Sequence, residues 1–173
     1  YIEDEPKAAA LGAGLEIEKA SGCMIVDIGG GTTDIAILSL GSIVDSTSIN
    51  IAGNHFDKAI IDYIKNKYDL LIGEKTAEEI KINLGTLNDI NKDNTLEIKG
   101  RSIKDGMPKT VVITEEEIKE ALLPEIDKIN IEIKKVLEKI SPELSSDIVD
   151  KGIIITGGGA LLRGIADYIE DDI

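Results

Sequence analysis

Three apolar segments near the start of the chain predict three consecutive β-strands. Residues 23–28, 34–40 and 42–51 are rich in isoleucine, valine and leucine, and only short turns separate them. Gly41-Ser42 forms the tightest of these turns. Because connections this short join antiparallel neighbours, we expect the three strands to form an antiparallel meander.

Apolar residues at helical spacing dominate the rest of the chain, with short alternating runs between them. Two segments, 76–79 and 114–117, have the capping-box form Thr-x-x-Glu, and each should begin a helix. Pro124 is expected to kink the second of these helices or to delay its start. The expected helices cover 6–14, the segment after Gly53, 76–85, 115–140, the segment after Ser141 and 161–170, and the further strands cover 96–99, 110–113 and 152–156.

Together these elements predict an α/β fold with a mixed sheet. Its parts are the antiparallel three-strand meander, the helices around it, and a small α+β segment inserted in the middle of the chain. The strand at 152–156 is almost wholly apolar, so we expect it to be buried.

Composition excludes several functions. The chain has 173 residues, of which 42% are apolar, enough to fill the core of one domain. Its 19 basic and 33 acidic residues leave a net charge of −14, which repels nucleic acid and anionic membrane surfaces. The single cysteine, Cys23, lies in an apolar strand and is expected to be a core residue, which fits a cytoplasmic protein. Because the chain begins at Tyr1 and no strand follows its last helix, we expect it to be a piece of a longer protein.

Two glycine triplets are the strongest candidates for phosphate binding. Gly29-Gly30-Gly31 joins two predicted strands, whereas Gly157-Gly158-Gly159 joins a strand to a predicted helix that opens at Ala160. Both expose backbone N–H groups without side chains in the way, which suits an anionic phosphate. The first triplet is not a Rossmann fingerprint, because a strand follows it and it lacks the GxGxxG spacing, and it has no following P-loop lysine. Each triplet alone is also compatible with an ordinary tight turn.

Several polar side chains near these triplets have two interpretations. Asp27 ends an apolar strand, where a carboxylate is costly unless it is paired, so it could hold a water of a Mg²⁺–phosphate complex or accept hydrogen bonds from turn amides. The hydroxyls of Thr32 and Thr33 could donate to phosphate, although threonine is also a good strand residue. Glu5 could position a water, or it could complement the start of the helix that contains Pro6. Glu78 and Lys81 lie three residues apart on one helical face and are compatible with a surface pair.

Four segments together resemble the MreB/Mbl family of bacterial actin homologues, within the actin-like ATPase superfamily. Residues 5–15, EPKAAALGAGL, are similar to the family's EPxAAAxGxGL segment, and residues 26–33, VDIGGGTT, to its second phosphate loop. Residues 71–78, LIGEKTAE, are similar to its LIGERTAE stretch, and residues 156–164, TGGGALLRG, to its adenosine motif. The resemblance covers nearly the whole chain.

This resemblance implies ATP and Mg²⁺ as ligands and gives the candidate residues roles. Glu5 would orient the attacking water, and Asp27 would hold Mg²⁺ through a water. The β- and γ-phosphates would lie around Gly29, Gly30, Gly31, Thr32 and Thr33, the ribose and adenine near Glu78, Glu79, Ile80 and Lys81, and the adenosine near Gly157, Gly158, Gly159 and Ala160.

The resemblance also implies an architecture of two lobes that close on ATP. This chain would be the second lobe, with its core in residues 1–68 and 115–173 and a small inserted subdomain in residues 69–114. The first lobe and its phosphate loop would be absent. Because phosphate clamping needs both walls of the cleft, we expect the chain alone to bind ATP weakly and to hydrolyse it negligibly.

In the family, ATP-bound subunits stack head to tail into membrane-associated filaments that organise lateral wall synthesis in rod-shaped bacteria. The implied partners are therefore other copies of the protein and membrane proteins of cell-wall elongation, with no nucleic acid. The implied location is the cytoplasm at the inner face of the cell membrane, with membrane contact through the absent lobe.

Two other functions occur on the same fold: a chaperone-type ATPase, which would require a following peptide-binding domain, and a small-molecule kinase, which would require an acceptor pocket.

Two residues also depart from the family pattern. Asp34 stands where MreB proteins usually carry Glu, as in heat-shock chaperone ATPases, and Lys7 replaces a typical Met.

Overall fold

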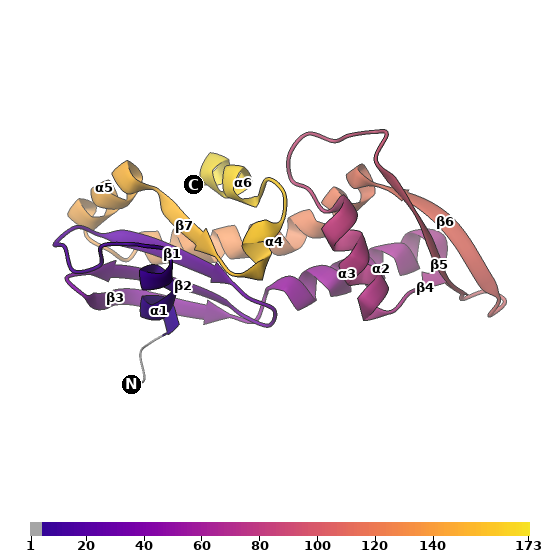
Figure 1. The fold of residues 1–173 in the computed structure, drawn as a ribbon, viewed down its shortest axis with the longest axis horizontal. Coiled ribbons are helices and arrows are strands. Elements are labelled where there is room, and N and C mark those ends of the chain that lie inside the picture. The colour runs from indigo at the N-terminus through magenta and orange to yellow at the C-terminus, as the bar shows by residue number, and fades with distance from the viewer. Residues whose placement is uncertain (1–4) are drawn as a thin grey trace. The chain divides into compact units, whose positions relative to one another are not determined.

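The computed structural model describes residues 5–173, and the first four residues of the expected 1–68 segment lie outside the described part. Figure 1 shows the helices and strands of this part of the chain. In order they are α1 (Glu5–Gly12), β1 (Cys23–Ile28), β2 (Thr33–Ser39), β3 (Ser42–Ile49), α2 (Gly53–Tyr68), β4 (Leu70–Leu71), α3 (Glu74–Leu84), β5 (Thr95–Ser102), β6 (Pro108–Thr114), α4 (Glu115–Leu137), α5 (Pro142–Lys151), β7 (Ile153–Thr156), a 3₁₀ turn η1 (Gly158–Leu161) and α6 (Ile165–Asp172).

The chain divides into two units. The first contains Tyr1–Gly53, Lys128–Leu161 and Ile169–Ile173, and the second contains Asn54–Asp127 and Leu162–Tyr168. The segment 69–114 lies wholly inside the second unit, whose bounds are wider. None of the helices between residues 5 and 173 is both long and apolar enough to cross a membrane.

The first unit is built on a four-stranded mixed sheet in the order β3-β2-β1-β7. The predicted meander is confirmed, because β1 pairs with β2 and β2 with β3, both antiparallel. The short strand β7 then returns beside β1 and pairs with it in parallel, with Asp27 opposite Thr156. The carboxyl ends of β1 and β7 therefore meet at the same edge of the sheet.

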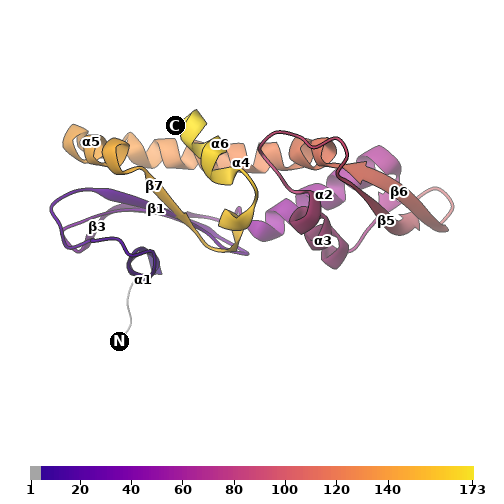
Figure 2. The same ribbon diagram turned by 45° about the horizontal axis from the view of Figure 1, so that its top comes forward.

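Helices cover both faces of this sheet (Figure 2). On one face α1 contacts β1 and β2, and Ala10 and Ile17 pack against Cys23, Ile25 and Leu38. On the other face lie α5 and the carboxyl-terminal part of α4. Cys23 is a buried core residue, as the sequence predicts, and burial raises the pKa of its thiol.

The second unit holds a three-stranded antiparallel sheet in the order β4-β5-β6. The helix α3 contacts β5, and α2 is joined to α4 by side-chain bonds such as Tyr63 to Glu120 at 2.7 Å. Apolar residues from all three helices, including Ile64, Ile80 and Leu122, are fully buried.

Four details of the expected elements are wrong. The helix α3 begins at Glu74 after Gly73, which makes no side-chain cap, so the Thr76 capping box does not form. Pro124 does not delay α4, which runs from Glu115 through it without a break. The strand β7 is only half-buried, because it lies at the end of the sheet over the described residues. The helix expected at 161–170 begins at Ile165, because η1 and Gly164, with φ of 78°, precede it.

Candidate nucleotide site

A row of three polar residues crosses the sheet of the first unit where β1 and β7 end. Asp27 on β1 lies opposite Asp34 on β2 and opposite Thr156 on β7. Side chains directly opposite each other in neighbouring strands share one face, so the two carboxylates are cross-strand neighbours. Like charges in this arrangement destabilise the pair unless a cation or a donor lies between them. Part of this repulsion is offset by the Thr32 hydroxyl, which donates to Asp34 Oδ2 at 3.1 Å.

The third member of the row has an unsatisfied hydrogen-bonding group. The Thr156 hydroxyl oxygen is buried and has no hydrogen-bond partner in the described residues. Buried polar atoms are rarely left without a partner, and the exceptions mark strain, a water, an ion or a ligand. Thr156 and Asp27 therefore fit a bound polar group at this edge of the sheet.

The first glycine triplet forms the hairpin between β1 and β2, as predicted. The Gly29 N–H donates to Thr32 O at 2.9 Å and closes the turn, while Gly30 and Gly31 are exposed at its tip. Thr33 is fully buried, and its hydroxyl donates to Ile51 O at 2.6 Å. Because the Thr33 hydroxyl proton is donated to Ile51 O, this side chain holds the base of the loop in place in this structure.

The second glycine triplet packs directly against the end of β1. A Cβ built on Gly157 would lie 2.4 Å from Asp27 Oδ1 and 2.4 Å from Ile28 O, and Gly157 has a φ of 82°. A Cβ on Gly159 would lie 2.2 Å from Ile28 Cγ2. Only glycine allows this approach, so the structure brings Asp27 and the two triplets together, although the triplets are far apart in the sequence. Ala160 follows in η1 and donates to Gly157 O at 3.2 Å.

Glu5 is the first residue of α1, which packs against β1 and β2. Its side chain is exposed. The helix covers the sheet face of Cys23 and Ile25, and strand alternation puts Asp27 on that same face. Glu5 and Asp27 thus belong to one face of the first unit. Nothing in the structure explains the lysine at position 7.

The predicted ribose- and adenine-binding residues lie on α3, in the second unit. Glu78 and Glu79 are exposed, whereas Ile80 is fully buried and contributes to the core. Lys81 makes an ion pair with Asp57 of α2 at 2.9 Å, with about a fifth of its side chain exposed. The candidates therefore fall into two groups: Glu5, Asp27 and the glycine triplets lie in the first unit, and Glu78 to Lys81 lie in the second.

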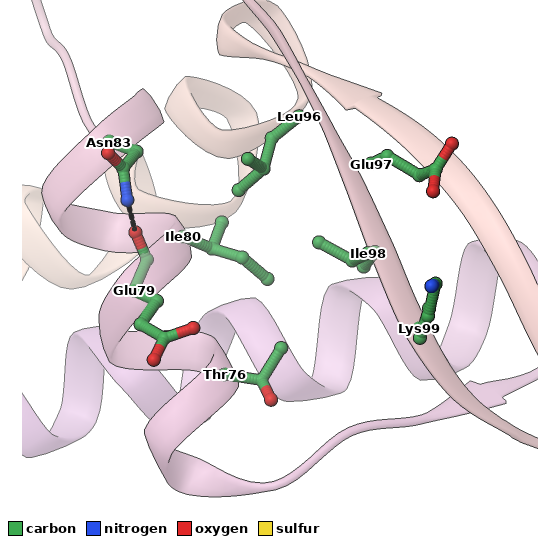
Figure 3. A pocket seen from close by; sticks show the side chains of 8 residues that line it. All are labelled: Thr76, Glu79, Ile80, Asn83, Leu96, Glu97, Ile98 and Lys99. Atoms are coloured by element: carbon green, nitrogen blue, oxygen red, sulfur yellow. Dashed lines mark hydrogen bonds between the residues drawn. The ribbon is translucent and has the colours of Figure 1, made fainter.

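A pocket of about 400 Å³ opens between α3 and β5 (Figure 3). Two of its residues, Glu79 and Ile80, belong to the predicted nucleotide-binding stretch. The Asn83 amide donates to Glu79 O at 2.7 Å on its rim. Its lining residues are Thr76, Glu79, Ile80, Asn83, Leu96, Glu97, Ile98 and Lys99.

Sequence reasoning missed a partly buried ionic network between the exposed Arg163 and the buried Glu115. Arg163 donates to Glu115 Oε1 at 2.7 Å and, through Nε, to Gly85 O at 3.0 Å. Glu115 is 1% exposed and also accepts from the Asn91 N–H and the Asn94 amide. Burial alone would raise the pKa of Glu115, but these hydrogen bonds and the Arg163 charge outweigh it and lower the pKa.

This network joins the end of α3, the loop before β5 and the start of α4. The only sequence signal for it was the Arg163-Gly164 ending of the glycine motif. Gly164 is needed there because a Cβ would lie 2.0 Å from Asn88 Oδ1.

The fold is that of the actin-like ATPases, as its likeness to solved structures shows. Solved structures agree: MreB5 of Spiroplasma citri bound to AMPPNP superposes with a TM-score of 0.95 at 49% identity, over 98% of this chain and 51% of that chain. A MreB5 structure bound to ADP gives the same TM-score over 52% of that chain. The MamK double helical filament gives 0.76 at 25% identity, over 97% of this chain and 50% of that chain.

The family model described as MreB/Mbl protein matches residues 1–173, and the chain belongs to this family. The cell shape-determining protein Mbl of Bacillus cereus is 53% identical over all of this chain and 52% of its own length. The cell shape-determining protein MreB of Escherichia coli is 44% identical over 95% of this chain and 48% of its own length. The chain thus spans about half the length of these relatives.

Proposed function

We propose that this chain is one lobe of a filament-forming, cell shape-determining ATPase that binds Mg-ATP. The observation that carries the proposal is the row of Asp34, Asp27 and Thr156 beside two glycine triplets at one edge of the sheet. A Mg²⁺–phosphate complex would relieve the repulsion between the two carboxylates and give the buried Thr156 hydroxyl a partner. The AMPPNP- and ADP-bound MreB5 structures support a nucleotide as the ligand.

The residues of the first unit would bind Mg²⁺, bind the phosphates and position the phosphate-binding loop. Asp27 would hold Mg²⁺ through a water, because Mg²⁺ gives up its waters reluctantly and takes its other ligands from the phosphates. The exposed hairpin of Gly30, Gly31 and Thr32 would donate N–H groups to the β- and γ-phosphates. Thr33 would position this hairpin through its bond to Ile51 rather than touch phosphate.

The remaining candidates would act on the other parts of the nucleotide. Gly157 to Ala160 would lie along the adenosine, where a side chain on the glycines would not fit. Glu78, Glu79 and Lys81 would contact ribose and adenine, with Asp57 holding the Lys81 ammonium in place and the buried Ile80 side chain fixing α3 beneath them. Glu5 would orient the attacking water and accept its proton. When bound, Mg²⁺ would neutralise the charge that develops on the phosphates.

We further propose that a second lobe completes the site, because the chain spans only half the length of its relatives. Self-assembly is supported by the filament structure of MamK. Attachment to the inner face of the cell membrane and binding to wall-elongation proteins complete the proposal. The chaperone and kinase alternatives are disfavoured, because the relatives named above are cell shape-determining proteins.

Sedimentation of the full-length protein with and without Mg-ATP tests this function. We expect polymer to pellet above a critical concentration in Mg-ATP. In Glu5→Ala, loss of the water-positioning group should slow phosphate release about 100-fold, and the polymer should persist longer. Glu18→Ala, an exposed glutamate in the loop before β1, is the matched control and should behave as wild type.

Two results would contradict the proposal. A full-length protein that hydrolyses ATP but stays soluble would refute filament formation, and unchanged phosphate release in Glu5→Ala would refute the role of Glu5. For the 173-residue chain alone, titration calorimetry should show ATP binding weaker than the micromolar range. Micromolar affinity would show that one wall of the cleft is sufficient.

A further inference from the structure

The strand β5 is fully paired on one side and almost unpaired on the other. On one side, residues 95–101 pair with residues 108–114 of β6. On the other side β4 contributes only two residues, Leu70 and Leu71, which pair with Ser102 and Arg101. Within residues 5–173, no strand pairs with residues 95–100 on the β4 side, so this part of β5 is an open edge inside the unit.

Two hydrogen bonds show which backbone groups point to that open edge. The Ser102 N–H donates to Met107 O, toward β6, and the Ile103 N–H donates to Asp69 O, toward β4. Backbone groups alternate between the two sides along a strand. The N–H and C=O groups of Glu97 and Lys99 therefore face the β4 side, and those of Ile98 face β6.

The open edge borders the pocket between α3 and β5, which we call the α3–β5 groove. Ile80 and Ile98 are buried at its base, and Figure 3 shows Leu96 and Ile98 extending toward α3. Thr76 and Glu79 stand on the α3 side. The groove thus combines unpaired strand hydrogen-bonding groups, an apolar base and a polar rim, which are the features of a site for an added strand.

The negative charge at the groove favours a basic ligand. Glu79 and Glu97 are both exposed on the rim, Lys99 is the only cation among the lining residues, and the whole chain carries a net charge of −14. An acidic segment would be repelled, whereas lysine or arginine side chains would be attracted. An aliphatic residue at every second position would face the half-buried Leu96, because side chains alternate along a strand.

We infer that the α3–β5 groove binds an extended basic-aliphatic peptide segment of a partner protein, which adds a strand antiparallel to β5 in line with β4. Its backbone bonds with Glu97 and Lys99, and its aliphatic residues contact the half-buried Leu96, below which Ile80 and Ile98 are packed. The open edge of residues 95–100, at ~3.4 Å per residue, is roughly 20 Å long and accommodates a segment of about six residues. The groove lies in the second unit and shares Glu79 and Ile80 with the stretch that is proposed to contact ribose and adenine.

Amide exchange in the 173-residue chain tests the inference most directly. The probe is the capped peptide acetyl-Lys-Val-Lys-Val-Lys-Val-Lys-amide, added to the chain while exchange is followed residue by residue by NMR. The amides of Glu97 and Lys99 should exchange quickly in the free chain and slow by about tenfold or more with peptide, since each gains a strand hydrogen bond. The Ile98 amide, already bonded to β6, should be slow in both samples. Unchanged exchange at Glu97 and Lys99 overturns the inference.

Fluorescence anisotropy with labelled peptides supplies the controls. A peptide with glutamate in place of lysine, and one with N-methylated valine amides, should each bind about tenfold more weakly or worse, because they lose charge attraction and backbone bonds. Equal binding of either peptide overturns the inference.

A pair of proline variants separates the two edges of the sheet. Lys99→Pro removes an N–H that faces the groove and should weaken binding about tenfold, whereas Thr110→Pro removes one on the outer edge of β6 and should leave binding unchanged. Equal affinity of the two variants counts against the site. If Lys99→Pro unfolds, the exchange measurement on the unaltered chain decides.

Discussion

Gly157 provides the sharpest test of how the second triplet is built. Alanine there would place its Cβ 2.4 Å from both Asp27 Oδ1 and Ile28 O, and would hold an L-residue at a φ of 82°. The neighbouring Gly158 offers a matched control in the same turn, because a Cβ on it meets no atom within 4 Å. The two substitutions add the same methyl group to adjacent residues with opposite surroundings.

The size of the effect follows from these two contacts and the backbone angle. A non-glycine residue in the left-handed region costs ~1–2 kcal/mol, and overpacking against the fixed end of β1 costs ~1–3 kcal/mol. Gly157→Ala should therefore lower the free energy of unfolding by ~2–5 kcal/mol. In a domain of this size ~1 kcal/mol shifts the Tm by ~2–4 °C, so we expect a loss of roughly 4–20 °C.

Thermal unfolding followed by circular dichroism measures this directly, with a urea titration as the second measure. Gly158→Ala should remain within ~0.5 kcal/mol of the wild type, as surface substitutions do. A Tm for Gly157→Ala within ~2 °C of Gly158→Ala would refute the close packing of the triplet on β1. It would also remove the reason for placing adenosine against a side-chain-free surface.

Two further predictions concern the second unit. Glu115→Gln should cost ~1.5–3 kcal/mol at pH 7, because charged hydrogen bonds to Arg163 are lost, whereas the exposed Glu116→Gln should cost less than ~0.5 kcal/mol. Since the folded-state pKa of Glu115 is lowered, its contribution is present above the ordinary glutamate pKa of ~4.3 and is lost as pH falls through the folded pKa. In urea titrations the gap between wild type and Glu115→Gln should therefore shrink in acid, and an equal gap at pH 3 and pH 7 would contradict this. Burial and the bond to Glu117 raise the pKa of Tyr68 to about 12. An alkaline absorbance titration should therefore show a phenolate component that forms late in the wild type and is missing in Tyr68→Phe. If the late component persists in Tyr68→Phe, it belongs to another tyrosine and the prediction fails.

Where local chemistry decides an element, the sequence predicted it well. The Thr114 capping box forms as expected, with the Thr114 N–H donating to Glu117 Oε2 at 2.8 Å and the Glu117 N–H to Thr114 Oγ1 at 3.4 Å. The Thr76 box has the same pattern but does not form, because α3 continues two residues upstream to Glu74. The difference lies in the preceding residues: β6 ends at Thr114, whereas Gly73 leaves the backbone before Thr76 free to be helical.

In the candidate site, too, residue types were predictable from the sequence and contacts between distant residues were not. Both glycine triplets and Asp27 were identified from residue type and position alone. Their meeting was not predictable, because it depends on β7 pairing in parallel with β1 across more than a hundred residues of intervening chain. The unsatisfied Thr156 hydroxyl and the Arg163–Glu115 ion pair were invisible for the same reason.

The sequence by itself determined most of the elements, the meander, the glycine loops and the family, because periodicity, turn residues and motifs are local properties of neighbouring residues. Only the tertiary structure decided that Asp34, Asp27 and Thr156 form one row, and that Thr33 turns its hydroxyl inward to Ile51. It also decided that one edge of β5 stays open beside α3. These features depend on which distant strands pair and in which register, and that is set by the burial of whole faces rather than by any single segment.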